Sequence, residues 1–201
     1  MDSLENRKRE LHEMSPAELG RLFPIELVGY NPEWKKVFED EKEKIELRLA
    51  GITTTRISHI GSTAIPGIMA KPTIDILLEI NFSKETMMTE TLAMDNQLSL
   101  IKMGLEAEGY HCLQKPENPP PHMMFVKGYT LAGFSGQAFH LHLRYPGDWD
   151  EIRFRDYLLQ HSEAAAEYEK LKIRLAEQFR NDRDGYTNAK GGFIASINKM
   201  D

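Results

Sequence analysis

The chain has 201 residues and a mass of 23.1 kDa, with 41% hydrophobic and 28% charged residues, which is typical of one globular domain. Its net charge of −6 argues against an extended nucleic-acid-binding surface, because such surfaces carry excess positive charge. The single cysteine excludes an intramolecular disulfide framework, and no apolar run resembles a membrane span or a secretion signal. We therefore expect a cytoplasmic protein without membrane association.

The N-terminal part is expected to be separate from the main domain. Residues 1–24 predict a charged arm followed by a short helix, and residues 25–201 predict a single domain. The short helix has a clear start signal, because Ser15 can cap it, Pro16 suits its first position and Glu18 can close a capping box.

The rest of the chain first mixes strand and helix patterns and then ends in helices. Short β-branched or apolar runs predict strands, and amphipathic runs with start and stop signals predict helices. In chain order the sequence predicts a strand over 25–30, a helix from 31, strands over 53–60 and 73–80, a helical region over about 83–109 with a break near Asp95 and Asn96, strands over 110–114, 122–128 and 139–145, and helices over 148–161, 162–182 and 187–199, the last after a stop at Asp184 and Gly185. This order predicts an α+β fold in which a sheet is backed by a C-terminal helical layer.

The stretch HIGSTAIPGIMAKPTIDILLEI, residues 59–80, carries the main candidate site. A strand that ends in Gly61, Ser62 and Thr63 exposes backbone N–H groups and hydroxyls that suit phosphate oxygens. Lys71 would add a positive charge nearby. The alternative, an ordinary turn with a local cap, has about equal support because short Gly-Ser signals are weak.

An aspartate stands inside the apolar run that follows this turn. Asp75, Leu77 and Glu79 alternate along the predicted strand, so their side chains share one face. Two carboxylates on one face beside a phosphate-binding turn would suit Mg²⁺ or Mn²⁺. In the alternative interpretation, Asp75 accepts hydrogen bonds from a neighbouring loop.

Histidines form a second candidate set. His140 and His142 share one face of a predicted strand, and His59 precedes the Gly-Ser turn. Together with Asp75 they would suit a metal ion or proton transfer. The alternative is that each histidine is a hydrogen-bonded structural residue.

Basic and aromatic residues near the C-terminus are candidates for binding the substrate. Arg155 suits a phosphate, unless it forms an ion pair on the helix surface. Tyr168 lies one helical turn before Lys172, and Tyr186 lies one turn before Lys190, so each pair would present a ring and an ammonium to a nucleotide. Alternatively, the rings pack the helical layer and the lysines stay in solvent.

Several motifs in order resemble the GrpB family, also called UPF0157, of the nucleotidyltransferase superfamily. They are the 59–80 stretch together with VGYNPEWKKVFEDEKEKI, HLHLR, FRDYLLQHSEAAAEYEKLKIRLA and YTNAKGGFI, and the likeness covers about residues 25–197. The resemblance implies a nucleotidyltransferase-like mixed sheet with flanking helices. It also implies phosphate binding by Gly61 and Ser62 and metal binding by Asp75. The chain departs from the superfamily pattern at Leu77, where a second carboxylate is usual, and it offers His140 and His142 where a third is expected.

These observations lead to one main hypothesis, in which the protein binds a nucleotide or another phosphorylated small molecule together with a divalent cation. The cation would be Mg²⁺ or Mn²⁺, with Zn²⁺ as a third option. If the protein is an enzyme, the resemblance implies transfer of a nucleotidyl group to an unknown acceptor. The alternatives are a catalytically degenerate module that binds a ligand or protein, and a metal-dependent phosphohydrolase. The assigned roles are catalysis by Asp75, Glu79 and His142, metal binding by Asp75, His140 and His142, and substrate binding by Gly61, Ser62, Thr63, Lys71, Arg155, Lys172, Tyr186 and Lys190. The oligomeric state stays open.

Overall fold

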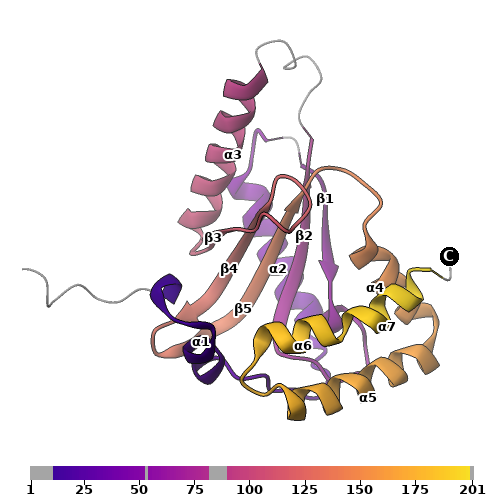
Figure 1. Ribbon diagram of the computed structural model, residues 1–201. Coiled ribbons are helices and arrows are strands. Elements are labelled where there is room, and N and C mark those ends of the chain that lie inside the picture. The colour runs from indigo at the N-terminus through magenta and orange to yellow at the C-terminus, as the bar shows by residue number, and fades with distance from the viewer. Residues whose placement is uncertain (1–10, 53, 82–89, 200–201) are drawn as a thin grey trace, which may run out of the picture.

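The computed structural model describes residues 11–52, 54–81 and 90–199 and has an α+β architecture (Figure 1). In chain order its elements are η1 (Leu11–Glu13), α1 (Pro16–Leu22), α2 (Glu33–Arg48), β1 (Thr54–Ile60), η2 (Ser62–Ala64), β2 (Thr73–Ile80), α3 (Glu90–Ala107), β3 (His111–Gln114), β4 (Met123–Thr130), β5 (Gly133–Arg144), α4 (Asp150–Gln160), α5 (Ser162–Gln178), α6 (Arg183–Ala189) and α7 (Gly191–Ile197). No helix in these described ranges has the length and apolarity that a membrane crossing requires.

The five strands form one mixed sheet in the order β1-β2-β5-β4-β3. The β2–β5 pair is parallel, and the other three pairs are antiparallel. The parallel pairing places Asp75 beside His140 and Leu77 beside His142, although the two strands lie far apart in the sequence. The predicted mixed sheet with flanking helices is confirmed.

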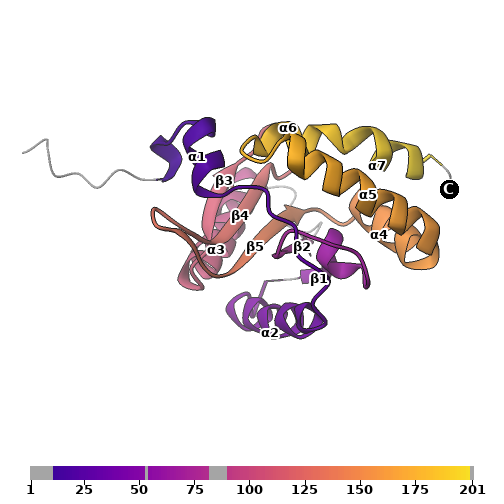
Figure 2. The ribbon, with the colours of Figure 1, turned by 90° about the horizontal axis from the view of Figure 1, so that it is seen from below.

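Helices cover both faces of the sheet (Figure 2). Alternate residues of β2, from Ile74 to Ile80, pack with α2, α3 and the central strands in the main hydrophobic core. The other face of the sheet, which carries Asp75, Leu77 and Glu79, is turned toward the C-terminal helices α4–α7. The predicted C-terminal helical layer is therefore confirmed, and it lies over the candidate site.

Two helix starts follow from local side-chain bonds. Ser15 and Glu18 form both halves of the predicted capping box at α1. Asp182 caps α6, because its side chain accepts a hydrogen bond from the Gly185 backbone N–H at 2.8 Å.

Three predictions about elements are wrong. Residues 25–30 do not form a strand, because their ladder is limited to a single bridge between Val28 and Ala70. Helix α3 continues through Asp95 and Asn96 without a break. The predicted stop at Asp184 and Gly185 lies inside α6, and α5 ends earlier, at Gln178, so the predicted helix over 187–199 is divided between α6 and α7. The first part of the predicted 83–109 helix, like residues 1–10 of the arm, lies outside the described residues.

Candidate functional site

The predicted phosphate turn packs directly against the predicted carboxylate. Strand β1 ends at Ile60, which pairs with Asp75, and the next residue, Gly61, has φ +72° and ψ −173°. Only glycine adopts this conformation readily. A Cβ atom on Gly61 would lie 2.3 Å from Oδ2 of Asp75. The turn and the carboxylate therefore lie side by side, as the sequence predicted.

Thr63 has a structural role in this turn. Its side chain is buried, its hydroxyl donates to the Thr73 carbonyl oxygen at 3.1 Å, and it lies 3.0 Å from Nε2 of His59. Both contacts hold the turn against the start of β2. The Thr63 hydroxyl is therefore engaged within the protein. Ser62 is half-buried, and its side chain has a hydrogen bond with Tyr168.

Asp75 is held by a chain of hydrogen bonds that extends to α6. Its Oδ1 lies 3.2 Å from Nδ1 of His140, and Nε2 of His140 lies 2.6 Å from the hydroxyl of Tyr129. The Tyr129 hydroxyl in turn accepts from Arg183 at 3.3 Å. Burial is the largest single influence and acts to raise the pKa of Asp75, but the hydrogen bond with His140 and the charges of His140, His142 and Lys71 together outweigh it, and the pKa is lowered. The carboxylate keeps 29% of its surface exposed and is accessible to a ligand.

The predicted set of three metal ligands is not assembled. Both ring nitrogens of His140 already have protein partners, and Nδ1 of His142 is buried without one. Burial lowers the pKa of His142 to about 4, so this ring is neutral at pH 7. Within the described ranges no three His, Cys, Asp or Glu side chains are grouped in a way that could hold a metal ion. Asp75 therefore fits a divalent cation only if phosphate oxygens supply further ligands.

Glu79 is committed to a different part of the fold. It lies four residues beyond Asp75, about 13 Å along the strand. Its carboxylate is buried, bonds to the guanidinium of Arg56 and accepts from the Gly147 N–H at 3.1 Å. The structure does not bring Glu79 to the Asp75 site, because these two partners hold it where the chain leaves β5.

Lys71 and Lys190 converge on one aromatic ring. Their ammonium groups lie 5.8 and 4.4 Å from the centre of the Tyr186 ring. Burial, together with the charges of Arg183 and Lys190 and against the opposing charge of Asp75, lowers the pKa of Lys71 to about 7. Burial also lowers the pKa of Lys190, again opposed by Asp75. The structure thus brings together two of the predicted cations at Asp75.

Lys172 lies behind these two lysines. Its side chain is 1% exposed, donates to the Met69 carbonyl oxygen, and places its ammonium 4.9 Å from the centre of the Tyr168 ring. Burial, together with the charge of Lys190 and against the opposing charge of Glu169, lowers the pKa of Lys172 to about 7. Lys172 adds positive potential to the site but is not at its surface.

Arg155 and His59 support the turn from outside the site. Arg155 donates to the His59 carbonyl oxygen at 2.8 Å and also pairs with Asp156. The His59 ring stacks on Phe38 of α2, on the opposite face of the sheet from Asp75. Neither side chain joins the Asp75 group, because strand alternation turns His59 away and the carbonyl of His59 occupies Arg155.

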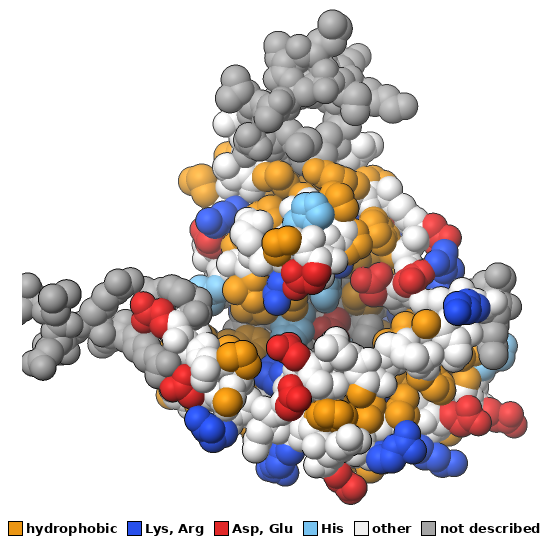
Figure 3. Space-filling view, viewed as in Figure 1, with side chains coloured by type: hydrophobic (Ala, Val, Ile, Leu, Met, Phe, Trp, Pro, Cys, Tyr) orange, Lys and Arg blue, Asp and Glu red, His pale blue; other side chains and the backbone are white. Residues whose placement is uncertain are grey.

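The site lies where the surface is hollowed between the sheet and the C-terminal helices, and histidine side chains are visible there in Figure 3. Asp75 and His140 come from the sheet, Ser62 from the turn, and Lys190 from the junction of α6 and α7. One accessible carboxylate next to several cations can bind an anionic ligand and orient one polar group of it.

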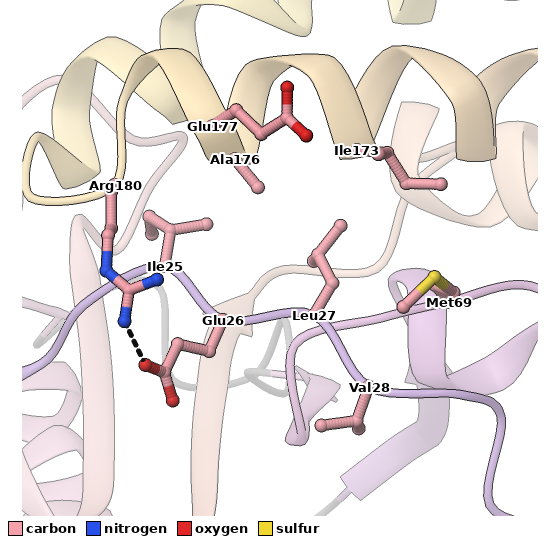
Figure 4. A pocket seen from close by; sticks show the side chains of 9 residues that line it. All are labelled: Ile25, Glu26, Leu27, Val28, Met69, Ile173, Ala176, Glu177 and Arg180. Atoms are coloured by element: carbon pink, nitrogen blue, oxygen red, sulfur yellow. Dashed lines mark hydrogen bonds and ion pairs between the residues drawn. The ribbon is translucent and has the colours of Figure 1, made fainter.

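A separate groove of about 450 Å³ lies between residues 25–28 and α5 (Figure 4). It is lined mainly by apolar side chains, and its charged residues include an ion pair between Glu26 and Arg180 at 2.5 Å. None of the predicted site residues lines it. The groove is therefore separate from the cluster of lysines beside Asp75.

Sequence reasoning missed Tyr129 and Arg183. Tyr129 stands near the end of β4, and Arg183 is the first residue of α6, so neither belongs to a recognisable motif. The pairing of β4 with β5 places Tyr129 on the same side of the sheet as His140. That pairing was not predicted in register.

The chain is similar to several GrpB proteins. The family described as "GrpB protein" matches residues 24–200. The "Glutamate-rich protein GrpB" of Alkalihalophilus pseudofirmus is 34% identical over 173 residues, which cover 85% of this chain and 92% of that protein. A UPF0157 protein of Halalkalibacterium halodurans is 29% identical over 203 residues, covering 98% and 95%. The crystal structure of conserved protein GrpB from Enterococcus faecalis matches with a TM-score of 0.70 and 24% identity, over 87% of this chain and 96% of that one, which shows a shared fold.

Proposed function

This chain belongs to the GrpB family, and we propose that it binds a nucleotide or another phosphorylated small molecule in the hollow beside Asp75. One observation carries the proposal. Lys71 and Lys190 flank the same ring of Tyr186, and neither ammonium forms an ion pair with a carboxylate of the described residues. Partly buried positive charges without counter-ions are unfavourable, and an anionic ligand between them would relieve that cost.

The chemistry of the surrounding residues favours phosphate over a carboxylate ligand. Lys172 adds a third buried ammonium behind the first two, so the site suits a ligand with more than one negative charge. The half-buried Ser62 stands next to Asp75 at the turn, where it would donate to a phosphate oxygen. Tyr186 is only 1% exposed, so its ring would not contact the ligand. It would contribute by packing against the two lysines that do.

A divalent cation would enter this site together with the phosphate. Mg²⁺ is commonly held by one or two carboxylates plus phosphate oxygens, and Asp75 is the residue that would supply the protein ligand. The ion would neutralise phosphate charge. The chain's own residues would bind the phosphate through Lys71 and Lys190 and keep the Asp75 carboxylate in place through His140.

Nucleotidyl transfer is the reaction that this arrangement would serve, and ligand binding without turnover is the second candidate. Leu77 favours the second, because it is fully buried at the position where a further carboxylate would neutralise a second metal ion. No feature of the described residues favours a metal-dependent phosphohydrolase.

Thermal unfolding with a panel of ligands tests the proposal. Nucleoside triphosphates and monophosphates, sugar phosphates and pyrophosphate would each be added with Mg²⁺, Mn²⁺, Zn²⁺ or EDTA. A ligand at 100 times its Kd stabilises the folded state by about 2.7 kcal/mol, which is a readily measured shift. We expect at least one phosphorylated compound to stabilise the wild type, and Lys190→Met to abolish the shift.

Lys170→Met is the matched control, because Lys170 is exposed on α5 away from Asp75. An equal shift in wild type and Lys190→Met, or no shift with any phosphorylated compound, would contradict the proposal. Turnover of a bound nucleotide that is lost in Asp75→Asn would distinguish transfer from binding alone.

A further inference from the structure

The chain of hydrogen bonds from Arg183 through Tyr129 and His140 to Asp75, here called the Arg183 relay, has a defined direction. A guanidinium only donates hydrogen bonds, and an ionised carboxylate only accepts them. Arg183 stands at one end and Asp75 at the other. The two ends therefore determine which groups donate in between.

The contact at Asp75 requires a proton on one ring nitrogen of His140. Nδ1 lies 3.2 Å from the carboxylate oxygen Oδ1, so Nδ1 must carry the hydrogen. In a neutral ring Nε2 is then an acceptor. It lies 2.6 Å from the Tyr129 hydroxyl. The oxygen of that hydroxyl accepts from Arg183 and also has a hydrogen bond with the Thr73 side chain, so the Tyr129 proton is the hydrogen directed at Nε2.

Packing restricts the two rings to this arrangement. The His140 and Tyr129 rings are stacked with an interplanar angle of 14° and centroids 5.6 Å apart. Arg183 is itself fixed, because its other terminal nitrogen donates to the Phe23 carbonyl oxygen at 2.9 Å and its guanidinium lies 5.7 Å from the centre of the Tyr129 ring. The relay is thus anchored to the sheet, to α6 and to the N-terminal segment.

The Arg183 relay gives the two carboxylate oxygens of Asp75 different partners. His140 holds Oδ1, while Oδ2 is the oxygen that faces Gly61, 2.3 Å from where a Cβ atom on that residue would lie. We propose that Tyr129 and Arg183 are positioning residues, which hold His140 in its Nδ1–H tautomer and thereby keep Oδ2 of Asp75 directed at the turn. This inference deepens the proposed function, because Oδ2 is the oxygen left for a ligand or its cation.

The tautomer can be measured without any ligand, by long-range ¹H–¹⁵N NMR of the histidine rings at pH 7. The His140 signals would be assigned by their absence in His140→Asn. We expect a protonated Nδ1 and an unprotonated Nε2 in the wild type. A protonated Nε2, in a neutral or a charged ring, would overturn the proposal whether or not the protein binds phosphates.

A second measurement compares Tyr129→Phe with the wild type. The variant keeps the stacked ring and removes only the hydroxyl, so Nε2 of His140 loses its donor. We expect mixed tautomers in the NMR spectrum and an affinity for pyrophosphate with Mg²⁺ that is about 10-fold weaker, the usual effect of losing a residue that orients a ligand-binding group. Tyr30→Phe, which removes a hydroxyl from a ring packed against Trp34, should change neither.

The outcomes separate the two proposals. If the wild type shows the Nδ1–H tautomer but binds no phosphorylated compound, the relay stands and the proposed function fails. If Tyr129→Phe keeps a pure Nδ1–H tautomer and full affinity, Tyr129 is not a positioning residue, and the inference fails while phosphate binding stands.

Discussion

Gly61 shows how one residue can connect the backbone to the site. Its φ is +72°, and a Cβ atom at this position would lie 2.3 Å from Oδ2 of Asp75, so there is room for hydrogen alone. The turn approaches the carboxylate closely because no side chain separates them. A ligand that contacts the turn would therefore also contact Asp75.

Gly61→Ala should destabilise the protein by about 1–3 kcal/mol, because the alanine would be strained and its methyl group would displace the carboxylate. Urea unfolding measures this change, and the pyrophosphate affinity should fall with it. Gly29→Ala serves as the control, since nothing lies within 4 Å of the place its Cβ atom would take. Equal unfolding free energies for Gly61→Ala and wild type would show that the turn and Asp75 are not in close contact.

The lowered pKa of Lys71 predicts how ligand affinity depends on pH. Because the pKa of Lys71 in the free protein is lowered to about 7, this side chain is largely neutral at pH 9. A bound phosphate favours the charged lysine, so binding takes up protons, and affinity should weaken as the pH rises from 7 to 9. Calorimetry in buffers of different ionisation enthalpy measures the proton uptake at pH 8. Binding of pyrophosphate with proton release, or with affinity independent of pH, would contradict this assignment.

At the scale of elements, α6 is short but carries much of the site. It contains Arg183 and Tyr186, and Lys190 follows its last residue. A helix of this length has little stability by itself and depends on its cap and its packing. Asp182 supplies the cap, so it should affect the site without contacting a ligand.

Asp182→Ala should cost about 0.5–2 kcal/mol of stability, the usual effect of losing a side-chain cap. It should also weaken pyrophosphate binding, because Lys190 would be held less firmly. Asp184→Ala is the matched control, since it removes a carboxylate from the first turn of the same helix without removing the cap bond. Urea unfolding and titration of both variants make the comparison, and equal losses would show that the cap is not the cause.

At the scale of the whole molecule, three distant parts of the chain meet around the site. The Ile25 N–H donates to the Arg180 carbonyl oxygen at 2.7 Å, and Arg183 donates to the Phe23 carbonyl oxygen. Both bonds join the N-terminal segment to the C-terminal helices, and Tyr129 joins them to the sheet. Buried charge at this junction therefore affects the stability of the folded state as a whole.

Stability without ligand should rise between about pH 7 and 10. The pKa values of Lys71 and Lys172 are lowered to about 7 in the folded state, so over this range the unfolded chain binds more protons. Each such lysine contributes a slope of about 1.4 kcal/mol per pH unit. Lys172→Met should reduce the slope measured by urea unfolding, and the exposed Lys170→Met should not. A slope unchanged in Lys172→Met would mean that Lys172 is charged in the folded protein.

Much of the fold followed from local patterns. Strand β2 matches its predicted range, and the capping box at α1 formed as expected. The failures occurred where tertiary contacts decide, as at residues 25–30, whose N–H groups find partners in Arg180, just beyond α5, and at Ala70 instead of in a strand ladder. In the site, the turn and Asp75 were predictable because they are close in the sequence, whereas Glu79 was misassigned because its partners Arg56 and Gly147 lie on other segments.

By itself, the sequence determined that a glycine-serine turn precedes a strand with one aspartate, and that histidines alternate along another strand. These are properties of neighbouring residues, set by backbone conformation and strand periodicity. Only the tertiary structure decided that the two strands pair in parallel, that Tyr129 and Arg183 complete the chain to Asp75, and that two lysines share one ring. The physical reason is that these contacts depend on strand order and helix packing, which join residues that no local pattern relates.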